Sequence, residues 1–352
     1  MTRSTMRARL AVLVLGAATV GRAAADEPRR FEFVETHMGS PFTILLYTAD
    51  EATARSASRA AFDRIARLDS VLSDYDPDSE LSRLSHAAGG PPVAVGPELF
   101  DVLETSREWF DRSGGLLDPT VAPVGRLWRR VRRERKLPDP EKIAAALPLV
   151  GMDKLILDPA ARTVRLTKPG MRLDVGGIAK GIASQQAIDV LRARGVDRAL
   201  VAGAGDIVVS GPPPGADGWT IGVASLEPSK RPPEIYLSLK DRATSTSGDA
   251  ERFVVIDGRR YSHIINPKTG QAIEERASVT VVAPDGATAD ALETTVYMMG
   301  REKGLEWIDS VPGAAAVYTR EDADGVVRRH ESGRFKDVPR SLPSRDSASP
   351  AE

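Results

Sequence analysis

The sequence predicts an α+β fold with mixed or antiparallel sheets and flanking helices, and three observations lead to this prediction. Strand-like apolar stretches and stretches with helical spacing follow one another irregularly, without a regular strand–helix alternation. The pair Asp257-Gly258 separates two short strand-like runs, which is a strong local signal for a hairpin. The chain has 352 residues, of which 41% are hydrophobic and 28% charged, as expected of a globular protein with an ample core.

The first 25 residues have the pattern of a secretory signal peptide. Arg3, Arg7 and Arg9 precede an apolar run at 10–20, and the alanines at 23–25 supply small residues for cleavage. The run is too short to span a membrane comfortably. We therefore expect an exported protein, periplasmic or otherwise extracytoplasmic, that is soluble after cleavage and carries no lipid-modified cysteine.

The composition excludes several kinds of site. The sequence contains no cysteine, which excludes disulfides, thiolate metal sites, iron–sulfur clusters and a cysteine nucleophile. Its four histidines leave little room for a multi-histidine zinc site, so oxygen ligands are expected for any metal. Because 48 Lys and Arg face 49 Asp and Glu, no basic excess points to nucleic acid.

The mature chain begins with a predicted strand pair, 31–34 and 42–47, interrupted by turn-forming residues at 36–41. The segment 51–72 is rich in alanine and spaces its large apolar residues as a helix does. A second helix is predicted at 97–111, where Ser113-Gly114-Gly115 ends it.

The middle of the chain contains a short helix and a hairpin. Pro140 is expected to open the helix, which extends to 147. Residues 154–157 and 163–166 have the pattern of a hairpin. Residues 178–194 form a well-marked predicted helix, which starts after two glycines and ends at Gly195.

The remaining elements are mostly strands. Residues 199–209 and 219–224 are predicted strands, 253–256 and 260–265 form the Asp257-Gly258 hairpin, and 278–283 is a further strand. A polar loop is expected at 244–249. Two helices follow, at 289–299 and 302–310. The tail from about residue 338 is rich in Ser and Pro and is expected to be disordered, which leaves 26–337 as one folded domain.

Four loop clusters concentrate glycine, aspartate and hydroxyl residues at the ends of elements: 113–120, 173–181, 202–206 and 288–294. Taken alone, each has a purely structural explanation as a turn, a bulge or a helix start. The second cluster, Leu173-Asp174-Val175-Gly176-Gly177-Ile178-Ala179-Lys180-Gly181, places glycines and Lys180 at a helix N-terminus. Free N–H groups and the helix dipole favour an anion there, although the spacing fits neither a P-loop nor G-x-G-x-x-G.

The fourth cluster suits a hard cation. Asp290 and Thr294 are four residues apart, so they share one face of the predicted helix, for which Thr288 is a plausible N-cap. A carboxylate and a hydroxyl on one face are ligands that Mg²⁺ accepts. The structural alternative is an acidic first turn favoured by the helix dipole.

A histidine in the hairpin region is a candidate general base. The unperturbed pKa of a histidine side chain is near 6.5, so a neutral imidazole at His263 could accept a proton. It could instead be a packed imidazole with no chemical role. Asp249, in the polar loop before the hairpin, is the competing base.

Taken together, these segments resemble the ApbE family of FAD:protein FMN transferases from about residue 36 to about 300. The matching segments, in chain order, are Met38-Gly39-Ser40, Ser73-Asp74-Tyr75 with Ser79 and Leu81, GGLLDPTVAPVGRLW at 114–128, LDVGGIAKG at 173–181, GAGDI at 203–207, TSGDAERF at 246–253, YSHIINPKTG at 261–270 and SVTVVAPDGATADALET at 278–294. Each match alone is weak, but eight in order are strong.

The resemblance implies an ApbE-like (T-fold-like) architecture with a cleft that binds FAD and Mg²⁺. Such enzymes attach FMN through a phosphodiester to a threonine of a target flavoprotein and release AMP. The implied FAD contacts are Met38, Tyr75, Leu116, Leu117, Asp118, Asp174, Lys180 and Ile264. The implied Mg²⁺ ligands are Gly177 through its carbonyl, Asp290 and Thr294, with Glu293 as a further, outer ligand.

The resemblance also implies an acceptor, of the class of flavinylated subunits of membrane redox complexes, which would bring the protein close to the inner membrane. The chain departs from the family pattern at four positions: Ala250 replaces a tyrosine, Asn266 an aspartate, Ala204 a glycine and Leu117 a phenylalanine. Two alternatives to transfer therefore stay open. One is FAD hydrolysis to FMN and AMP, and the other is a non-catalytic flavin-binding protein.

Overall fold

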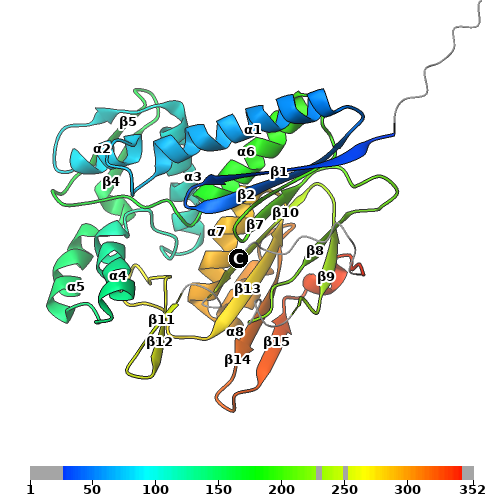
Figure 1. Ribbon diagram of the computed structural model, residues 1–352. Helices are drawn as coiled ribbons and strands as arrows, with labels where there is room; N and C mark the ends of the chain where they lie inside the picture. Colours follow the sequence, from blue (N-terminus) through cyan, green and yellow to red (C-terminus); the bar gives the residue numbers. More distant parts are fainter. Residues whose placement is uncertain (1–26, 227–231, 249–252, 343–352) are drawn as a thin grey trace, which may run out of the picture.

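The computed structural model describes residues 27–226, 232–248 and 253–342. The predicted signal peptide, Asp249 and Ala250 lie outside these residues. An eight-stranded sheet forms the centre, in the order β1-β2-β6-β7-β10-β13-β14-β15, and each neighbouring pair is antiparallel. With its flanking helices, this sheet confirms the predicted α+β class (Figure 1).

The helices are α1 Glu51–Leu72, α2 Glu80–His86, α3 Pro97–Arg112, α4 Ala122–Glu134, α5 Pro140–Ala146, α6 Ala179–Ala193, α7 Gly286–Met299 and α8 Arg301–Ile308. The strands of the central sheet are β1 Arg29–His37, β2 Ser40–Thr48, β6 Ala199–Gly203, β7 Asp206–Val209, β10 Arg242–Gly248, β13 Ala277–Ala283, β14 Ala315–Glu321 and β15 Val327–Glu331. Smaller sheets contain β3 Val93–Ala94, β4 Leu155–Asp158, β5 Thr163–Leu166, β8 Trp219–Gly222, β9 Tyr236–Leu239, β11 Phe253–Ile256 and β12 Arg259–Ser262.

The strands of the central sheet alternate their side chains between two cores, as the period of two requires. On β2, Phe42, Ile44 and Leu46 enter the core beneath α1, α6 and α7, whereas Leu45 enters a second core on the opposite face. The β8–β9 hairpin covers that second face, where Trp219 is completely buried. Helices α1, α6 and α7 thus cover one face of the sheet, and α1 runs beside α6 (Figure 1).

A third, smaller core joins α4 to the β11–β12 hairpin. Val124, Trp128 and Val131 recur at helical spacing on α4 and pack with Val254 and Tyr261 of the hairpin. The Trp128 ring lies 5.5 Å from the Tyr261 ring, and its indole N–H donates to the Gly270 carbonyl at 2.8 Å. This core fixes α4 and the hairpin as a unit opposite the central helices.

Two glycines allow α6 and α7 to approach each other closely. A Cβ atom built on Gly181 would lie 2.1 Å from the Gly286 carbonyl oxygen, and one built on Gly286 would lie 2.2 Å from the Gly181 carbonyl oxygen. Real Cβ atoms do not come so near to a backbone oxygen, so neither position accommodates a larger residue without movement. The first turns of the two helices are therefore in backbone contact, close to Lys180 on α6 and Asp290 on α7.

Several predicted elements were wrong. The expected strand 199–209 is a hairpin of β6 and β7, because Ala204 adopts φ 55° in the turn between them. Residues 244–249 were expected to be a polar loop, but residues 244–248 belong to β10, inside the central sheet. The strand expected at 260–265 ends at Ser262. Thr288 is not the N-cap of α7, since Asp285 caps the helix and accepts from the Thr288 N–H at 2.9 Å.

The start of the predicted tail is folded. The Pro339 carbonyl accepts from the Ser238 N–H at 2.8 Å, and Arg340 forms a bridge with Leu237. Residues 338–342 therefore belong to the domain rather than to a disordered tail, and the rest of the tail lies beyond the described residues. Within those residues, no helix is both long enough and apolar enough to cross a membrane.

Candidate functional site

A cavity of about 980 Å³ opens between the central helices and the unit formed by α4 and the hairpin. Every predicted site residue that the structure describes lines it. These are Met38, Tyr75, Leu116, Leu117, Asp118, Asp174, Gly177, Lys180, His263, Ile264, Asp290, Glu293 and Thr294. The structure thus brings residues from six separated segments to one space, while Asp249 lies outside the described residues.

The N-terminus of α6 brings a cation to one wall of the cavity. Lys180 lies in the first turn of the helix, as predicted, and its Nζ lies 3.4 Å from Asp206 Oδ2. Asp206 is the first residue of β7 and is buried, and its Oδ1 accepts from the Ser245 hydroxyl at 2.7 Å. The sequence marked Asp206 only as the end of a glycine turn, so its place in the site was missed.

The first turns of α7 bring buried acids to the same wall. Asp290 is 1% exposed, and its Oδ2 accepts from the Gly181 N–H at 2.9 Å. Burial, and then the charge of Asp206, raise the pKa of Asp290 to about 7, although Lys180 acts in the opposite direction. Asp290 is therefore poised between its neutral and ionised forms near neutral pH.

Glu293 has an orphaned oxygen beside this acid. The side chain is buried, and its Oε1 accepts from the Thr294 hydroxyl at 2.8 Å. Its Oε2 has no hydrogen-bond partner in the described part of the chain. Burial raises the pKa of Glu293 well above its usual range, and the charges of Asp290 and Asp206 add to this.

These donors fit a hard cation. A buried, unpartnered carboxyl oxygen next to a second carboxyl group and a hydroxyl is a costly arrangement that a bound cation would relieve. Gly177 lies beside them, since a Cβ atom built on it would lie 3.8 Å from Thr294 Oγ1. Among the described residues, no group of three or more His, Cys, Asp or Glu side chains could hold a metal. A cation here would therefore depend on hydroxyl and carbonyl oxygens as well.

The opposite rim contains an arginine held between two carboxylates. Arg129 of α4 pairs with Asp74 and donates to Asp174 Oδ2 at 2.6 Å. Its guanidinium lies 4.4 Å from the centre of the Tyr75 ring, which is otherwise 76% exposed. Arg129 and Asp74 were not predicted as site residues. Asp174 and Arg129 thus line the cavity as an ion pair.

Local hydrogen bonds explain how the turn-borne site residues are placed. Met38 adopts φ 50° in the tight turn between β1 and β2, and its N–H donates to Asp69 Oδ2 at 2.7 Å. The Ser113 hydroxyl accepts from the N–H groups of Leu116 and Leu117 at 3.1 and 3.0 Å. These two bonds fix the loop so that both leucines face the cavity.

Asp118 has a structural task within the same loop. Its Oδ1 accepts from both the N–H and the hydroxyl of Thr120, at 2.8 and 2.6 Å. Burial raises its pKa, although the two bonds from Thr120 act against this shift. Since one carboxyl oxygen already holds the turn, the other is the one that could meet a ligand.

The candidate base lies directly after β12. His263 is exposed on the cavity side of the hairpin, and the next residue, Ile264, is buried. The Ile264 N–H donates to the Ser262 hydroxyl at 3.2 Å, and its carbonyl accepts from the Ile273 N–H at 3.0 Å. His263 is therefore not a packed core imidazole, which was the structural alternative.

Comparison with known proteins identifies the family. The family model named ApbE family matches residues 38–318, which is most of the chain. The chain belongs to the ApbE family. An FAD:protein FMN transferase from Klebsiella pneumoniae is 31% identical over 93% of this chain and 96% of its own length. An FAD:protein FMN transferase from Treponema pallidum is 31% identical over 88% of this chain and 90% of its own length.

Solved structures of the ApbE family agree with the fold. The flavin transferase ApbE from Vibrio cholerae superposes with a TM-score of 0.79 at 27% identity, covering 88% of this chain and 99% of that one. The ApbE protein from Thermotoga maritima gives a TM-score of 0.79 at 28% identity, covering 89% and 100%. The predicted ApbE-like architecture and the predicted enzyme class, a transferase, are both confirmed by these relatives.

Proposed function

We propose that this ApbE-family chain is a Mg²⁺-dependent enzyme that cleaves FAD, attaches FMN by a phosphodiester bond to a threonine of a target flavoprotein, and releases AMP. The observation that carries the proposal is that Lys180, paired with Asp206 of β7, lies on the same wall of a large cavity as the buried acids of α7. This arrangement suits a pyrophosphate, which is negatively charged and itself binds Mg²⁺. Lys180 would attract the pyrophosphate, and the acids would hold the metal beside it.

Asp290, Thr294 and the Gly177 carbonyl would hold Mg²⁺, with Glu293 as an outer ligand. The metal, when bound, offsets negative charge on the pyrophosphate and on the departing AMP oxygen. The residues of the chain then bind and orient the substrate. Lys180 would contact the pyrophosphate from the adjoining helix start, where the free N–H groups of α6 also favour an anion.

The apolar part of the cavity suits the flavin ring. Met38, Leu116, Leu117 and Ile264 all face the cavity and would supply a flat apolar wall for the ring. Tyr75 extends this wall at the rim, where Arg129 lies against its ring. Asp118 and Asp174 would contact polar groups of FAD. Leu117, in place of the family's usual phenylalanine, keeps this wall apolar.

Transfer requires a base for the acceptor threonine. The threonine oxygen attacks the phosphorus of the FMN half, the bond from that phosphorus to the AMP oxygen breaks, and the hydroxyl proton passes to the base. His263 is the first candidate, because it is exposed to the cavity next to Ile264. Asp249 is the competitor. We further propose export by the signal peptide and an acceptor of the redox-complex class at the inner membrane.

One experiment tests the proposed function. The purified protein is incubated with FAD, Mg²⁺ and a flavoprotein acceptor, and the products are separated by denaturing electrophoresis and chromatography. Fluorescent flavin that stays on the acceptor, with AMP released in equal amount, supports transfer. Free FMN and AMP without labelled acceptor would instead establish hydrolysis, and bound but intact FAD would establish a flavin-binding protein.

A further inference from the structure

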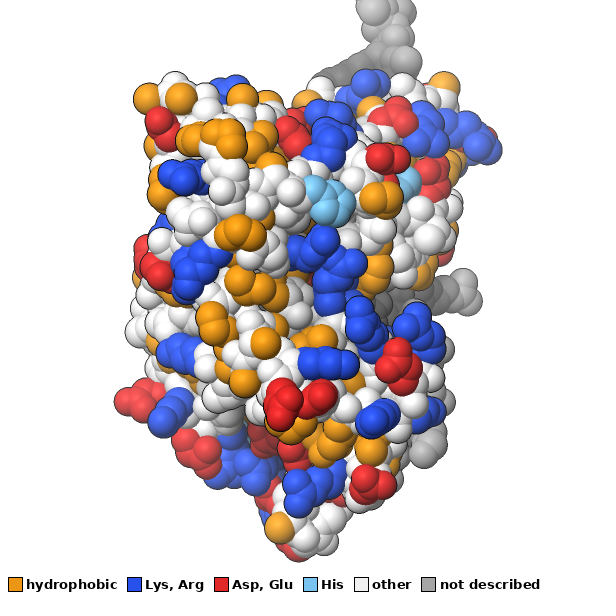
Figure 2. All heavy atoms as spheres, turned by 90° about the vertical axis from the view of Figure 1, so that its left-hand side faces the viewer, with side chains coloured by type: hydrophobic (Ala, Val, Ile, Leu, Met, Phe, Trp, Pro, Cys, Tyr) orange, Lys and Arg blue, Asp and Glu red, His pale blue; other side chains and the backbone are white. Residues whose placement is uncertain are grey.

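The outer side of α4 and the residues after it concentrate positive charge. Residues 126–136 contain seven Lys or Arg and a single Glu, in a chain whose formal net charge is −1. We call the exposed members of this set the basic stripe: Arg126, Arg130, Arg132, Arg133, Arg135 and Lys136. Figure 2, which views the face on the left of Figure 1, shows Lys and Arg side chains gathered across its middle.

Most of these charges have no ion-pair partner among the residues that the structure describes. Arg133 pairs with Glu134 at 3.2 Å. The described residues offer no ion pair or hydrogen bond to the side chains of the other five members of the basic stripe. Ion pairs within the fold therefore do not account for the concentration of arginine, and the charge is available to a partner.

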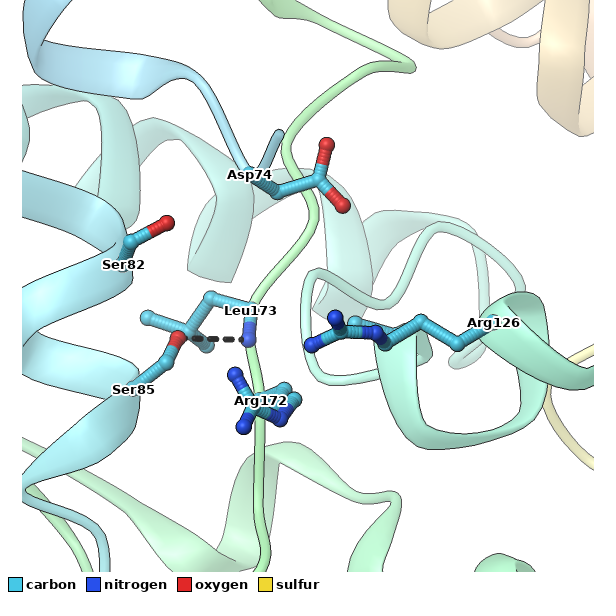
Figure 3. Close-up of a pocket in the computed structure, with 7 residues that line it drawn as sticks. Asp74, Ser82, Ser85, Arg126, Arg172 and Leu173 are labelled. Carbon is cyan, nitrogen blue, oxygen red and sulfur yellow. Dashed lines mark hydrogen bonds between the residues drawn. The ribbon is translucent and has the colours of Figure 1, made fainter. Parts of the chain in front are cut away.

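An arginine outside α4, Arg172, adds positive charge at one end of the basic stripe. Arg172, in the segment before α6, lines a small pocket together with Arg126 and Asp74. Figure 3 shows the Arg126 side chain extending from α4 toward Arg172. Burial and the charge of Arg126 lower the pKa of Arg172. The pocket, of about 10 Å³, holds no more than a water molecule, so it is too small for a ligand. Its relevance here is that two arginines lie side by side along it.

The stripe lies next to the opening of the catalytic cavity. Gly125, Trp128, Arg129 and Arg132 recur at helical spacing along α4 and line the cavity. Arg126, Arg130 and Arg133, at positions i, i+4 and i+7, form the neighbouring row on the same helix. A partner bound along this row would therefore lie directly at the edge of the cavity.

We infer that the basic stripe docks an acidic segment of the acceptor protein, next to the threonine that receives FMN. This inference rests on the proposed function. An acidic segment complements the charge, and an extended chain can follow the helix while its threonine reaches into the cavity. A flat anionic membrane pressed on the same row would cover the adjoining opening. Complementary charge chiefly raises the association rate and the specificity of binding. Salt screens such charges and so weakens the binding.

The test measures binding by the intact protein loaded with FAD and Mg²⁺. The probe is a fluorescein-labelled peptide with one threonine among Asp and Glu residues, and a Lys-rich peptide of the same length is the counterpart. The variant Arg130→Glu/Arg133→Glu/Lys136→Glu reverses three charges that do not line the cavity. The matched control, Lys240→Glu/Lys303→Glu/Lys336→Glu, changes the net charge equally at three exposed lysines elsewhere.

We expect the acidic peptide to bind wild type and the control alike, and the stripe variant at least about 10-fold more weakly, with binding that falls as salt rises. Wild type should not hold the Lys-rich peptide. The inference would be overturned if the stripe variant bound the acidic peptide as tightly as wild type does. It would also be overturned if the control variant lost as much affinity as the stripe variant. A third outcome would also overturn it: the protein binds phosphatidylglycerol vesicles through the stripe but does not bind the acidic peptide.

Two further measurements keep the result interpretable. The variant Arg130→Gln/Arg133→Gln/Lys136→Gln should bind with intermediate affinity, and melting curves should show that all three variants are folded. Because the experiment measures binding and not transfer, its failure leaves the proposed function standing. If the transfer assay fails while the peptide still binds, the proposed function is lost and the stripe has another acidic partner.

Discussion

Lys180 Nζ lies 3.4 Å from Asp206 Oδ2, so the cation at the start of α6 meets the carboxylate at the start of β7. The contact places one positive charge among three buried acids, since Asp290 and Glu293 lie on the same wall. Lys180 lowers the pKa of both of these acids against the opposing effect of burial. The lysine thus offsets negative charge within the acid cluster, and it is also the proposed contact for the pyrophosphate.

We predict that Lys180→Met weakens FAD binding by about 10-fold or more, the size expected when a hydrogen bond to a charged group is lost. Quenching of FAD fluorescence measures the dissociation constant. Lys240→Met, which removes an exposed lysine away from the cavity, should leave that constant unchanged. An unchanged affinity in Lys180→Met would remove the lysine from the anion site.

We predict that Asp290→Asn abolishes Mg²⁺-dependent transfer while FAD still binds weakly. The amide keeps an oxygen for the Gly181 N–H but loses the charge that attracts a cation. Transfer rates at several Mg²⁺ concentrations provide the measurement. Asp189→Asn, at an exposed position on α6, is the control and should behave as wild type. Undiminished activity in Asp290→Asn would refute the metal assignment.

The metal-free protein should lose stability as pH rises from about 4 to about 7. The raised pKa of Asp290, about 7, means that the folded state binds this proton more tightly than the unfolded state does. Unfolding then releases a proton in this pH range, so the free energy of unfolding falls as pH rises. Added Mg²⁺ favours the ionised form. It should raise the melting temperature at pH 8 and have little effect at pH 5, and an equal effect at both values would contradict the cation site.

His263→Ala should lower single-turnover transfer by roughly 10²–10⁴-fold, the range typical of a positioned general base, with FAD affinity nearly unchanged. In wild type, the rate should fall as pH drops through the histidine pKa, because only neutral imidazole accepts a proton. His86→Ala, at an exposed position on α2 outside the cavity, is the control. If turnover per folded molecule stays near wild type, Asp249 becomes the remaining candidate.

Gly181→Ala should destabilise the protein by about 1–3 kcal/mol, the usual cost of overpacking, because the new methyl group meets the Gly286 carbonyl. Gly125→Ala provides a matched control within another helix, since a Cβ atom there has nothing within 4 Å. That change should be neutral or stabilise by about 0.5–1 kcal/mol. Urea unfolding curves measure both, and equal effects would show that the helix contact is not tight.

Elements with strong local signals were predicted well from the sequence. The helix expected at 51–72 coincides with α1, because its apolar spacing is regular and Asp50 caps its first turn. The Asp257-Gly258 turn forms as expected, with φ of 48° and 76° at its two residues. Both elements depend on residues close together in the chain, which is the information that periodicity and turn chemistry contain.

Elements that depend on distant partners were missed. β10 contains Thr244, Ser245 and Thr246 and was therefore read as a loop. Two of its hydroxyls have partners inside the sheet, since Ser245 donates to Asp206 and Thr246 bonds with Thr280. Helix α4 was not recognised either, since its many arginines mask the apolar row that packs against the hairpin. The grouping of the site residues came from the family resemblance, and their local chemistry alone would not have predicted it.

The glycine contact between α6 and α7 also bears on how the enzyme moves. Two helices in backbone contact cannot separate without losing that contact. We therefore expect the wall that carries Lys180 and Asp290 to be rigid. Any widening of the cavity to admit a dinucleotide, or a segment of another protein, must then come from the facing side, where α4 and the β11–β12 hairpin share a small core of their own. We therefore expect Lys180 and Asp290 to keep their relative positions, and the side formed by α4 and the hairpin to move when substrate and product exchange.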